Sequence, residues 1–233
     1  MKRIACLCLT LMLLLAAFPA QASTYTNMRE TAIAYMDITF ACGCKRTGAG
    51  TMVAVNGMLT AGHNLVCHTH NKKVKTCAFY FGYASKSDYY YKYNDSFTYT
   101  YYCDFSNGYA SKDDIGYIKF PTDVGKRTGW YATSVESDSD LSWEHCHTQG
   151  FKNGSRVYDW GVVTVADARQ ITWTRSSSFQ GCCEGGPLYY DYEGLEFPVL
   201  VAVYTSYDGA TGYARRLTNQ IFNDMKQSGV NFN

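Results

Sequence analysis

The sequence predicts an all-β fold with a single helix near its C-terminal end. From about residue 36 onward, short apolar runs alternate with Gly, Asn, Asp and Ser, which are typical turn residues. The chain has 21 Tyr among its 233 residues, and Tyr favours strands. Only the segment 217–227 has helical spacing, with Leu217, Ile221 and Met225 on one face. Many short strands followed by one helix are typical of a β-sandwich or β-barrel.

The expected strands follow one another without an internal repeat or a long linker. Residues 52–59 contain Asn56-Gly57, a favoured two-residue turn, and predict a hairpin. The tyrosine-rich segment 89–105 is interrupted by Asn94-Asp95. It predicts a second hairpin, half-buried rather than an exposed aromatic binding surface. A boundary between two subdomains is expected around residues 121–144. Further strands are expected at 76–83, 115–120, 157–165, 170–174, 188–192 and 198–204.

The first residues have the features of a secretory signal rather than of a folded element. Lys2 and Arg3 precede an almost wholly apolar run that ends at Phe18, and Ala20-Gln21-Ala22 supplies a small-x-small cleavage pattern. The run is too short for a comfortable membrane span of about 20 residues. We therefore expect a signal peptide over 1–22, cleaved near Ala22, and a mature secreted domain over 23–233.

Composition and charge limit the classes of partner. Hydrophobic residues make up 46% of the chain, which is too high for a disordered protein, and the formal net charge is only +1. No segment has the basic density that nucleic acid or an anionic membrane would require. We therefore expect no nucleic-acid partner and no membrane partner.

The mature chain would keep eight of the ten cysteines, and an even number in an oxidising compartment favours disulfides. Two clusters are rich in metal-ligand types, His68-Thr69-His70 and His145-Cys146-His147. Neither has the spacing of a zinc finger. We therefore expect no metal site and no cofactor, with Cys67 and Cys146 in disulfides. The eight cysteines are Cys42, Cys44, Cys67, Cys77, Cys103, Cys146, Cys182 and Cys183.

Three local motifs stand in an order that is informative when they are taken together. They are Leu59-Thr60-Ala61-Gly62-His63, the segment 114–120 (Asp-Ile-Gly-Tyr-Ile-Lys-Phe) and the segment 181–188 (Gly-Cys-Cys-Glu-Gly-Gly-Pro-Leu). They resemble the His, Asp and nucleophile segments of the trypsin/chymotrypsin superfamily. Residues 128–131 and 149–151 resemble segments of its bacterial glutamyl endopeptidase branch. The resemblance covers roughly residues 36–230.

This resemblance implies two antiparallel six-stranded-type β-barrels with a cleft between them. The first barrel would span about 36–120, the second about 145–213, and a C-terminal helix about 216–228. His63 would be the general base and Asp114, rather than Asp113, the carboxylate that orients the imidazole. The resemblance also implies a monomer that takes a protein or peptide ligand.

The chain departs from the family at the nucleophile. The family places its serine three residues before the proline, and counting back from Pro187 gives Glu184. A carboxylate is no substitute for the serine, because its charge would oppose the oxyanion that forms on the substrate. We expect Glu184 to pair with His63 instead, which makes the chain a catalytically inactive pseudoprotease. Cys183 stands where the activation Asp of trypsin-like enzymes would be, so no dependence on N-terminal processing beyond signal removal is expected.

An alternative alignment inserts one residue and makes Cys183 a thiol nucleophile with His63 as its base. Thiolates are good nucleophiles, and an adjacent imidazole lowers the pKa of a thiol. The cost is Glu184 at the place of the glycine that follows the nucleophile. This alternative predicts an active cysteine endopeptidase.

The resemblance also suggests a substrate pocket and a disulfide scheme. Ser178, Phe179 and Gln180 would form one wall, and the strand with Tyr204 and Ser206 the other. Tyr204 stands where glutamyl endopeptidases place a histidine, so specificity for Glu cannot be carried over. Two bridges are expected, one from Cys67 to Cys42 or Cys44 and one from Cys77 to Cys103.

Overall fold

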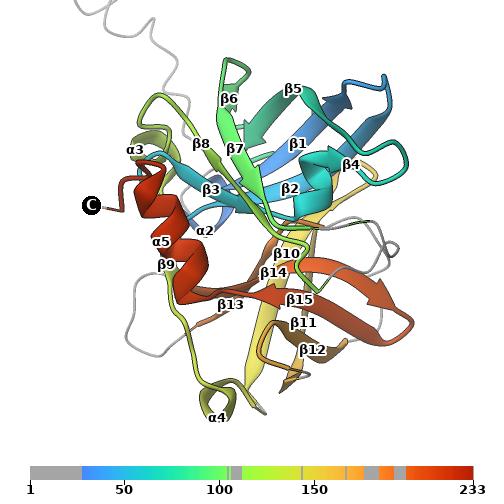
Figure 1. Ribbon diagram of the computed structural model, residues 1–233, viewed down its shortest axis with the longest axis vertical. Helices are drawn as coiled ribbons and strands as arrows, with labels where there is room; N and C mark the ends of the chain where they lie inside the picture. The colour runs from blue at the N-terminus through green and yellow to red at the C-terminus, as the bar shows by residue number, and fades with distance from the viewer. Residues whose placement is uncertain are drawn as a thin grey trace, which may run out of the picture.

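The computed structural model describes most of the chain after the expected signal peptide (Figure 1). The described residues are 28–103, 105, 112–142, 144–165, 167–175, 184–191 and 198–232. The predicted signal peptide and its cleavage near Ala22 lie outside them. None of the helices in these described segments has the length and apolarity that a membrane span needs.

The first barrel is an eight-stranded antiparallel sheet that begins at Ile33, slightly before the expected start near residue 36. Its strands run in the order β4-β5-β1-β2-β3-β8-β7, and β6 pairs with the free edge of β5. The core is filled by aromatic and long aliphatic side chains that include Phe79, Phe81 and Phe120. The strands are β1 (Ile33–Phe40), β2 (Lys45–Met52), β3 (Gly57–Thr60), β4 (Val66–Cys67), β5 (Lys72–Phe81), β6 (Tyr91–Tyr93), β7 (Thr98–Tyr101) and β8 (Gly116–Lys119).

One of the two predicted hairpins forms and the other does not. Strands β2 and β3 pair antiparallel across residues 53–56, as the segment 52–59 predicts. The expected hairpin over 89–105 is wrong, because β6 pairs with β5 whereas β7 pairs with β8. Phe97, between β6 and β7, packs edge-on against Phe79, with 5.2 Å between the ring centroids. The aromatic side chain thus stays with the core while the two strands pair with different neighbours.

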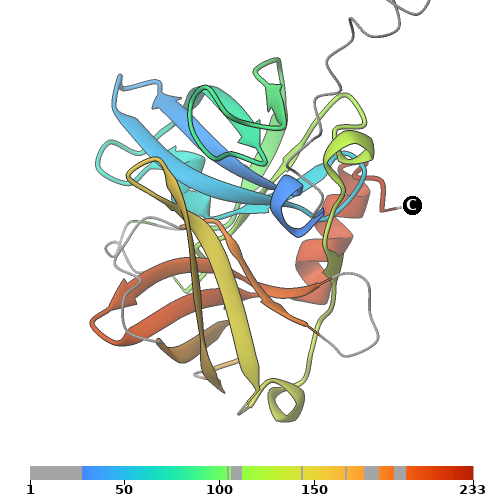
Figure 2. The ribbon, with the colours of Figure 1, turned by 180° about the vertical axis from the view of Figure 1, so that it is seen from behind.

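The second barrel is closed. Its strands run in the order β13-β10-β11-β12-β15-β14, and pairing of β13 with β14 completes the ring, while β9 adds a parallel edge to β14. Its core is a separate cluster that includes Trp173, Tyr204 and Leu188. Figure 2 shows the two barrels stacked one above the other. The strands are β9 (Ala132–Thr133), β10 (His145–Lys152), β11 (Ser155–Val165), β12 (Gln170–Arg175), β13 (Pro187–Tyr190), β14 (Val199–Asp208) and β15 (Thr211–Arg216).

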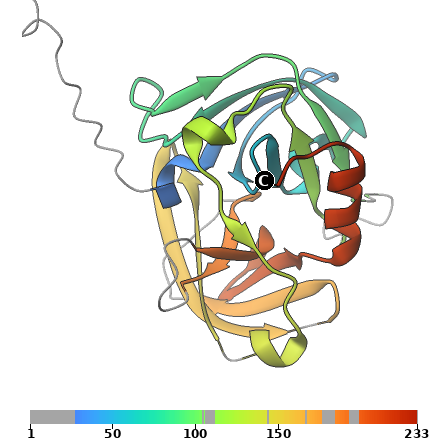
Figure 3. The same cartoon turned by 90° about the vertical axis from the view of Figure 1, so that its left-hand side faces the viewer.

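The C-terminal helix α5 (Asn219–Gln227) leaves the second barrel and packs on the first (Figure 3). Thr218 caps its N-terminus, since its side chain accepts a hydrogen bond from the backbone N–H of Ile221. Ile221 and Met225 are buried in the core of the first barrel. The helix therefore connects the two barrels. The shorter helices are α2 (Met28–Thr31), η1 (Gly62–Asn64), α3 (Gly125–Thr128) and α4 (Asp138–Leu141).

The packing of α5 predicts a large effect for Ile221→Ala. Ile221 is 2% exposed, so truncation leaves a cavity and should lower the free energy of unfolding by about 2–5 kcal/mol. Gln227→Ala, on the exposed side of the same helix, is the matched control and should change it by less than about 0.5 kcal/mol. Urea unfolding measures both. Equal effects of the two variants would contradict this packing.

Candidate active site

His63 lies in η1, the short helix that follows β3, and its side chain is fully buried. Its backbone N–H donates to Oδ1 of Asp114 over 2.8 Å, and its Nδ1 lies 2.5 Å from Oδ2 of the same carboxylate. Asp114 is buried just before β8. Two contacts to one carboxylate fix both the backbone and the ring of His63, and they make Nδ1 the protonated nitrogen.

Asp113, the less favoured candidate for the carboxylate that orients His63, points away from the imidazole. Its carboxylate lies 2.7 Å from the guanidinium of Arg169 and 3.4 Å from that of Arg215. Of the two neighbouring aspartates, Asp114 is therefore the one that faces His63.

Glu184 faces the opposite side of the imidazole. Its Oε2 lies 3.3 Å from Nε2 of His63, and its backbone carbonyl accepts hydrogen bonds from Ala49 N (3.0 Å) and Asn64 Nδ2 (2.9 Å). The next residue, Gly185, has φ of +96°, and a β-carbon there would lie 2.0 Å from the carbonyl oxygen of Ala49. Only glycine fits this turn, which holds Glu184 close to the first barrel.

Arg46 on β2 completes the cluster. Its guanidinium forms an ion pair with the same carboxylate oxygen of Glu184 that faces His63, and both side chains are 18% exposed. Asp114, His63, Glu184 and Arg46 thus form a row in which negative and positive groups alternate. Sequence reasoning missed Arg46, because it lies 138 residues from Glu184 and belongs to no motif.

The charges of this row shift the pKa values of its central pair. Burial alone would lower the pKa of His63, but the charge and hydrogen bond of Asp114, together with Glu184, outweigh it and raise the pKa. Burial alone would raise the pKa of Glu184, but His63 and Arg46 outweigh it and lower the pKa. Both shifts favour an imidazolium paired with a carboxylate. Such an imidazolium has no lone pair on Nε2 with which to act as a base.

One wall of the predicted pocket and the two cysteines before Glu184 lie outside the described residues. These residues are Ser178, Phe179, Gln180, Cys182 and Cys183.

Tyr204 and Ser206 lie on β14. Tyr204 is fully buried and packs against Trp173 at 5.4 Å, and its backbone pairs with Gly185 and Gly186. Ser206 is half-buried beyond a bulge in the pairing of β14 with β15.

The predicted disulfide scheme is wrong, because neither of its two bridges forms between the described cysteines. A Cys77–Cys103 bridge is not formed, because Cys77 is a free thiol on β5 while the Cys103 sulfur packs against Gly62 beside His63. Cys146 is also a free thiol, buried 3.5 Å from the carbonyl oxygen of Gly161. Cys67 is not bonded to Cys42 or Cys44, although their sulfur atoms lie within 4.8 Å of one another.

Several solved structures with a similar arrangement of barrels are proteases. A Glu endopeptidase shares 20% sequence identity, with a TM-score of 0.69 over 87% of this chain and 94% of that chain. The chain has the chymotrypsin-like fold. A thermostable serine protease from an extremophilic microorganism gives a TM-score of 0.69 at 10% identity, covering 86% of this chain and 98% of that chain. Protease Anisep from Arthrobacter nicotinovorans gives 0.67 at 13% identity, covering 85% and 95%. No family model and no curated protein sequence matches the chain.

The paired charges predict a pH window for the contribution of Glu184 to stability. Because the pKa of Glu184 is lowered, its charge stabilises the fold above the ordinary Glu value of about 4.3, and the effect is lost as the pH falls through the lowered value. Because the pKa of His63 is raised, its charge stabilises the fold below about 6.5, and the effect is lost as the pH rises through the raised value.

Glu184→Gln should therefore lower the free energy of unfolding most between about pH 4.5 and 6.5, and less on either side. Urea unfolding at a series of pH values measures the difference from the wild type. Glu144→Gln, which changes an exposed carboxylate before β10, is the matched control and should give a small, pH-independent difference. A flat profile for Glu184→Gln would count against the ion pair.

Proposed function

We propose that this protein is a secreted, catalytically inactive member of the chymotrypsin-like fold that acts by binding a protein or peptide ligand as a monomer. The observation that carries the proposal is the position of the Glu184 carboxylate, 3.3 Å from Nε2 of His63. In a working site of this type, Nε2 accepts the proton of the nucleophile. Here a carboxylate that is itself held by Arg46 stands at that nitrogen.

Glu184 is unsuited to replace the serine in chemistry as well as in charge. Attack by its carboxylate on a peptide carbonyl would form an anhydride, and the second carboxylate oxygen would remain beside the developing oxyanion. The lowered pKa of Glu184 keeps that negative charge in place at neutral pH. The pair therefore favours a site that binds without cleaving.

The cysteine-peptidase alternative requires the opposite arrangement of Glu184 and His63. Cys183 can act only if His63 is available to take the thiol proton, which requires Glu184 to leave Nε2. The contacts of Glu184 with Arg46 and of its carbonyl with Ala49 and Asn64 favour the inactive state.

Activity measurements separate the two functions. We expect peptide hydrolysis by the mature chain to be at background across a mixed peptide library, and a serine-directed phosphonate to leave its intact mass unchanged. Glu184→Ser should not restore full activity, because Cys182 and Cys183 replace the residues that normally precede the nucleophile. His63→Ala is the control for any residual hydrolysis.

Alkylation tests the thiol alternative directly. We expect slow reaction of Cys183 with iodoacetamide, unchanged in His63→Ala. Fast alkylation at Cys183 that is lost in His63→Ala, together with peptide cleavage that Cys183→Ala abolishes, would overturn the pseudoprotease proposal and establish a cysteine peptidase.

A further inference from the structure

A second cluster of reactive side chains lies at the rim of the first barrel, outside the proposed site. It consists of Cys42, Cys44, Cys67 and His70, whose ligand atoms all lie within 4.8 Å of one another. The first two residues come from the turn between β1 and β2, and the other two from the end of β4 and the turn that follows it. We propose that these four residues form a structural zinc site.

The distances agree with tetrahedral coordination. Nδ1 of His70 lies 3.4 Å from the sulfur of Cys44 and 3.6 Å from that of Cys67. Zinc with bonds of about 2.3 Å to sulfur and about 2.0–2.1 Å to nitrogen would separate a sulfur and a nitrogen ligand by about 3.5 Å. Three cysteines and one histidine are also a common ligand set of closed structural zinc sites.

The number of ligands favours a metal over a single disulfide. A bridge from Cys67 to Cys42 or Cys44 would use two sulfur atoms and leave the third thiol and His70 without a role. Zinc uses all four groups at once. The expectation of no metal site rested on the clusters 68–70 and 145–147, neither of which has zinc-finger spacing. Cys42 and Cys44 lie more than twenty residues before Cys67, so no local motif joins the four ligands.

The backbone is shaped to bring the ligands together. Gly43, between the first two cysteines, has φ of +87° in a turn where its N–H donates to Phe40 O over 2.9 Å. Asn71, next to His70, has φ of +48°. These left-handed residues close two tight turns, and a backbone hydrogen bond of 2.9 Å from Ala41 N to Lys73 O ties one turn to the other.

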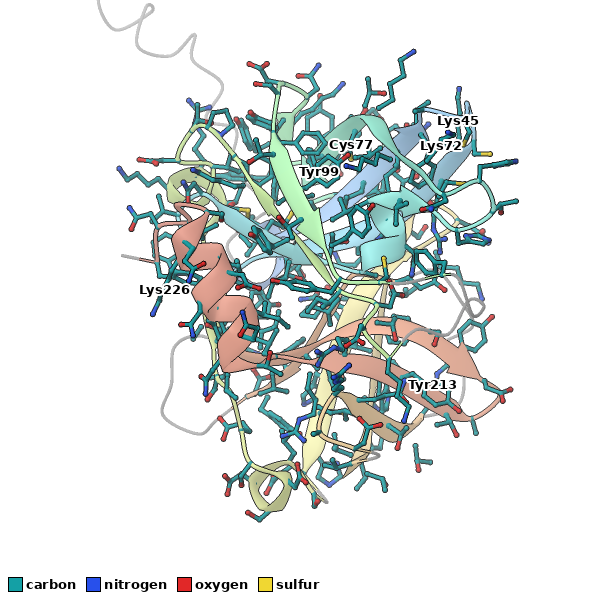
Figure 4. The ribbon with its side chains drawn as sticks, viewed as in Figure 1. Lys45, Lys72, Cys77, Tyr99, Tyr213 and Lys226 are labelled. Atoms are coloured by element: carbon teal, nitrogen blue, oxygen red, sulfur yellow. The ribbon has the colours of Figure 1, made fainter. Side chains whose placement is uncertain are left out.

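The local charge suits three thiolates. Zinc with three thiolates and a neutral imidazole carries a net charge of about −1. Lys45 on β2 and Lys72 on β5 lie at this same end of the first barrel, as Figure 4 shows, and Lys73 follows Lys72. Exposed lysines at this end of the barrel would offset that charge.

The site would position the charge row of the proposed active site. Cys44 lies two residues before Arg46, which holds Glu184, and Cys67 lies four residues after His63. Zinc would join the chain segments that carry these two residues. With four protein ligands the metal has no open position, so its role is structural rather than catalytic.

Metal analysis of the native protein tests the proposal. The full mature chain, secreted from culture and purified without chelators or a metal-affinity tag, should contain one equivalent of zinc by mass spectrometry of the elements. After exchange with Co(II), it should show the intense d–d bands of tetrahedral cobalt and a thiolate charge-transfer band. Absence of zinc together with absence of these bands in the reduced protein would overturn the proposal, as would a native disulfide from Cys67 to Cys42 or Cys44.

Variants assign the ligands. His70→Ala should weaken Co(II) binding by more than the roughly 10- to 100-fold that loss of an outer-shell partner costs, and His70→Cys should restore it with a stronger charge-transfer band. His145→Ala, an exposed histidine on β10, is the matched control and should leave binding unchanged. Cys44→Ser should also weaken Co(II) binding. If that variant fails to fold, the comparison of His70→Ala with His145→Ala still decides, since equal binding in these two would remove His70 from the site.

Discussion

The contact between Nε2 of His63 and the Glu184 carboxylate is the constraint on which the arrangement of the site depends. The imidazole lies between two carboxylates, with Asp114 2.5 Å from Nδ1 and Glu184 3.3 Å from Nε2. Arg46 pairs with the second carboxylate, so with His63 protonated, as its raised pKa favours, the row carries two positive and two negative groups. Removing one partner of a buried ion pair is costly, because it leaves an uncompensated charge in a low-dielectric environment. On the proposed function, the row stabilises an arrangement in which His63 does not act as a general base.

Each barrel contributes one side of this arrangement. The first barrel supplies His63 after β3, Asp114 before β8 and Arg46 on β2. The second supplies Glu184, whose neighbour Gly185 donates to Tyr204 O on β14 over 2.7 Å. Because Ala49 N bonds the carbonyl of Glu184, the site also joins the two barrels through the backbone. Helix α5 joins them again on the other side.

The fold could be predicted from the sequence because its signals are local and repeated. Short apolar runs, the Asn56-Gly57 turn and the spacing of Ile221 and Met225 each depend on neighbouring residues. The two-barrel arrangement came from the order of three motifs, not from periodicity. The prediction of a hairpin over 89–105 was wrong, because a turn signal at Asn94-Asp95 does not determine which strands the flanking segments pair with.

Only the site residues that stand in a sequence motif could be predicted. His63, Asp114 and Glu184 stand in recognisable segments, and the structure brings them together. Arg46 and the Cys42, Cys44, Cys67 and His70 cluster depend on contacts between distant hairpins, which no local pattern encodes. Two adjacent residues can also differ in role, since Asp114 meets His63 whereas Asp113 meets Arg169 on the surface.

The protonation of the His63 ring tests the central claim most directly. Nitrogen-15 NMR of the wild-type protein at neutral pH distinguishes an imidazolium from a neutral imidazole at each ring nitrogen. Both Nδ1 and Nε2 of His63 should carry a proton, since the imidazole is held between Asp114 and Glu184 and its pKa is raised. A neutral ring with an unprotonated Nε2 would contradict the central claim, because the general base would then be available.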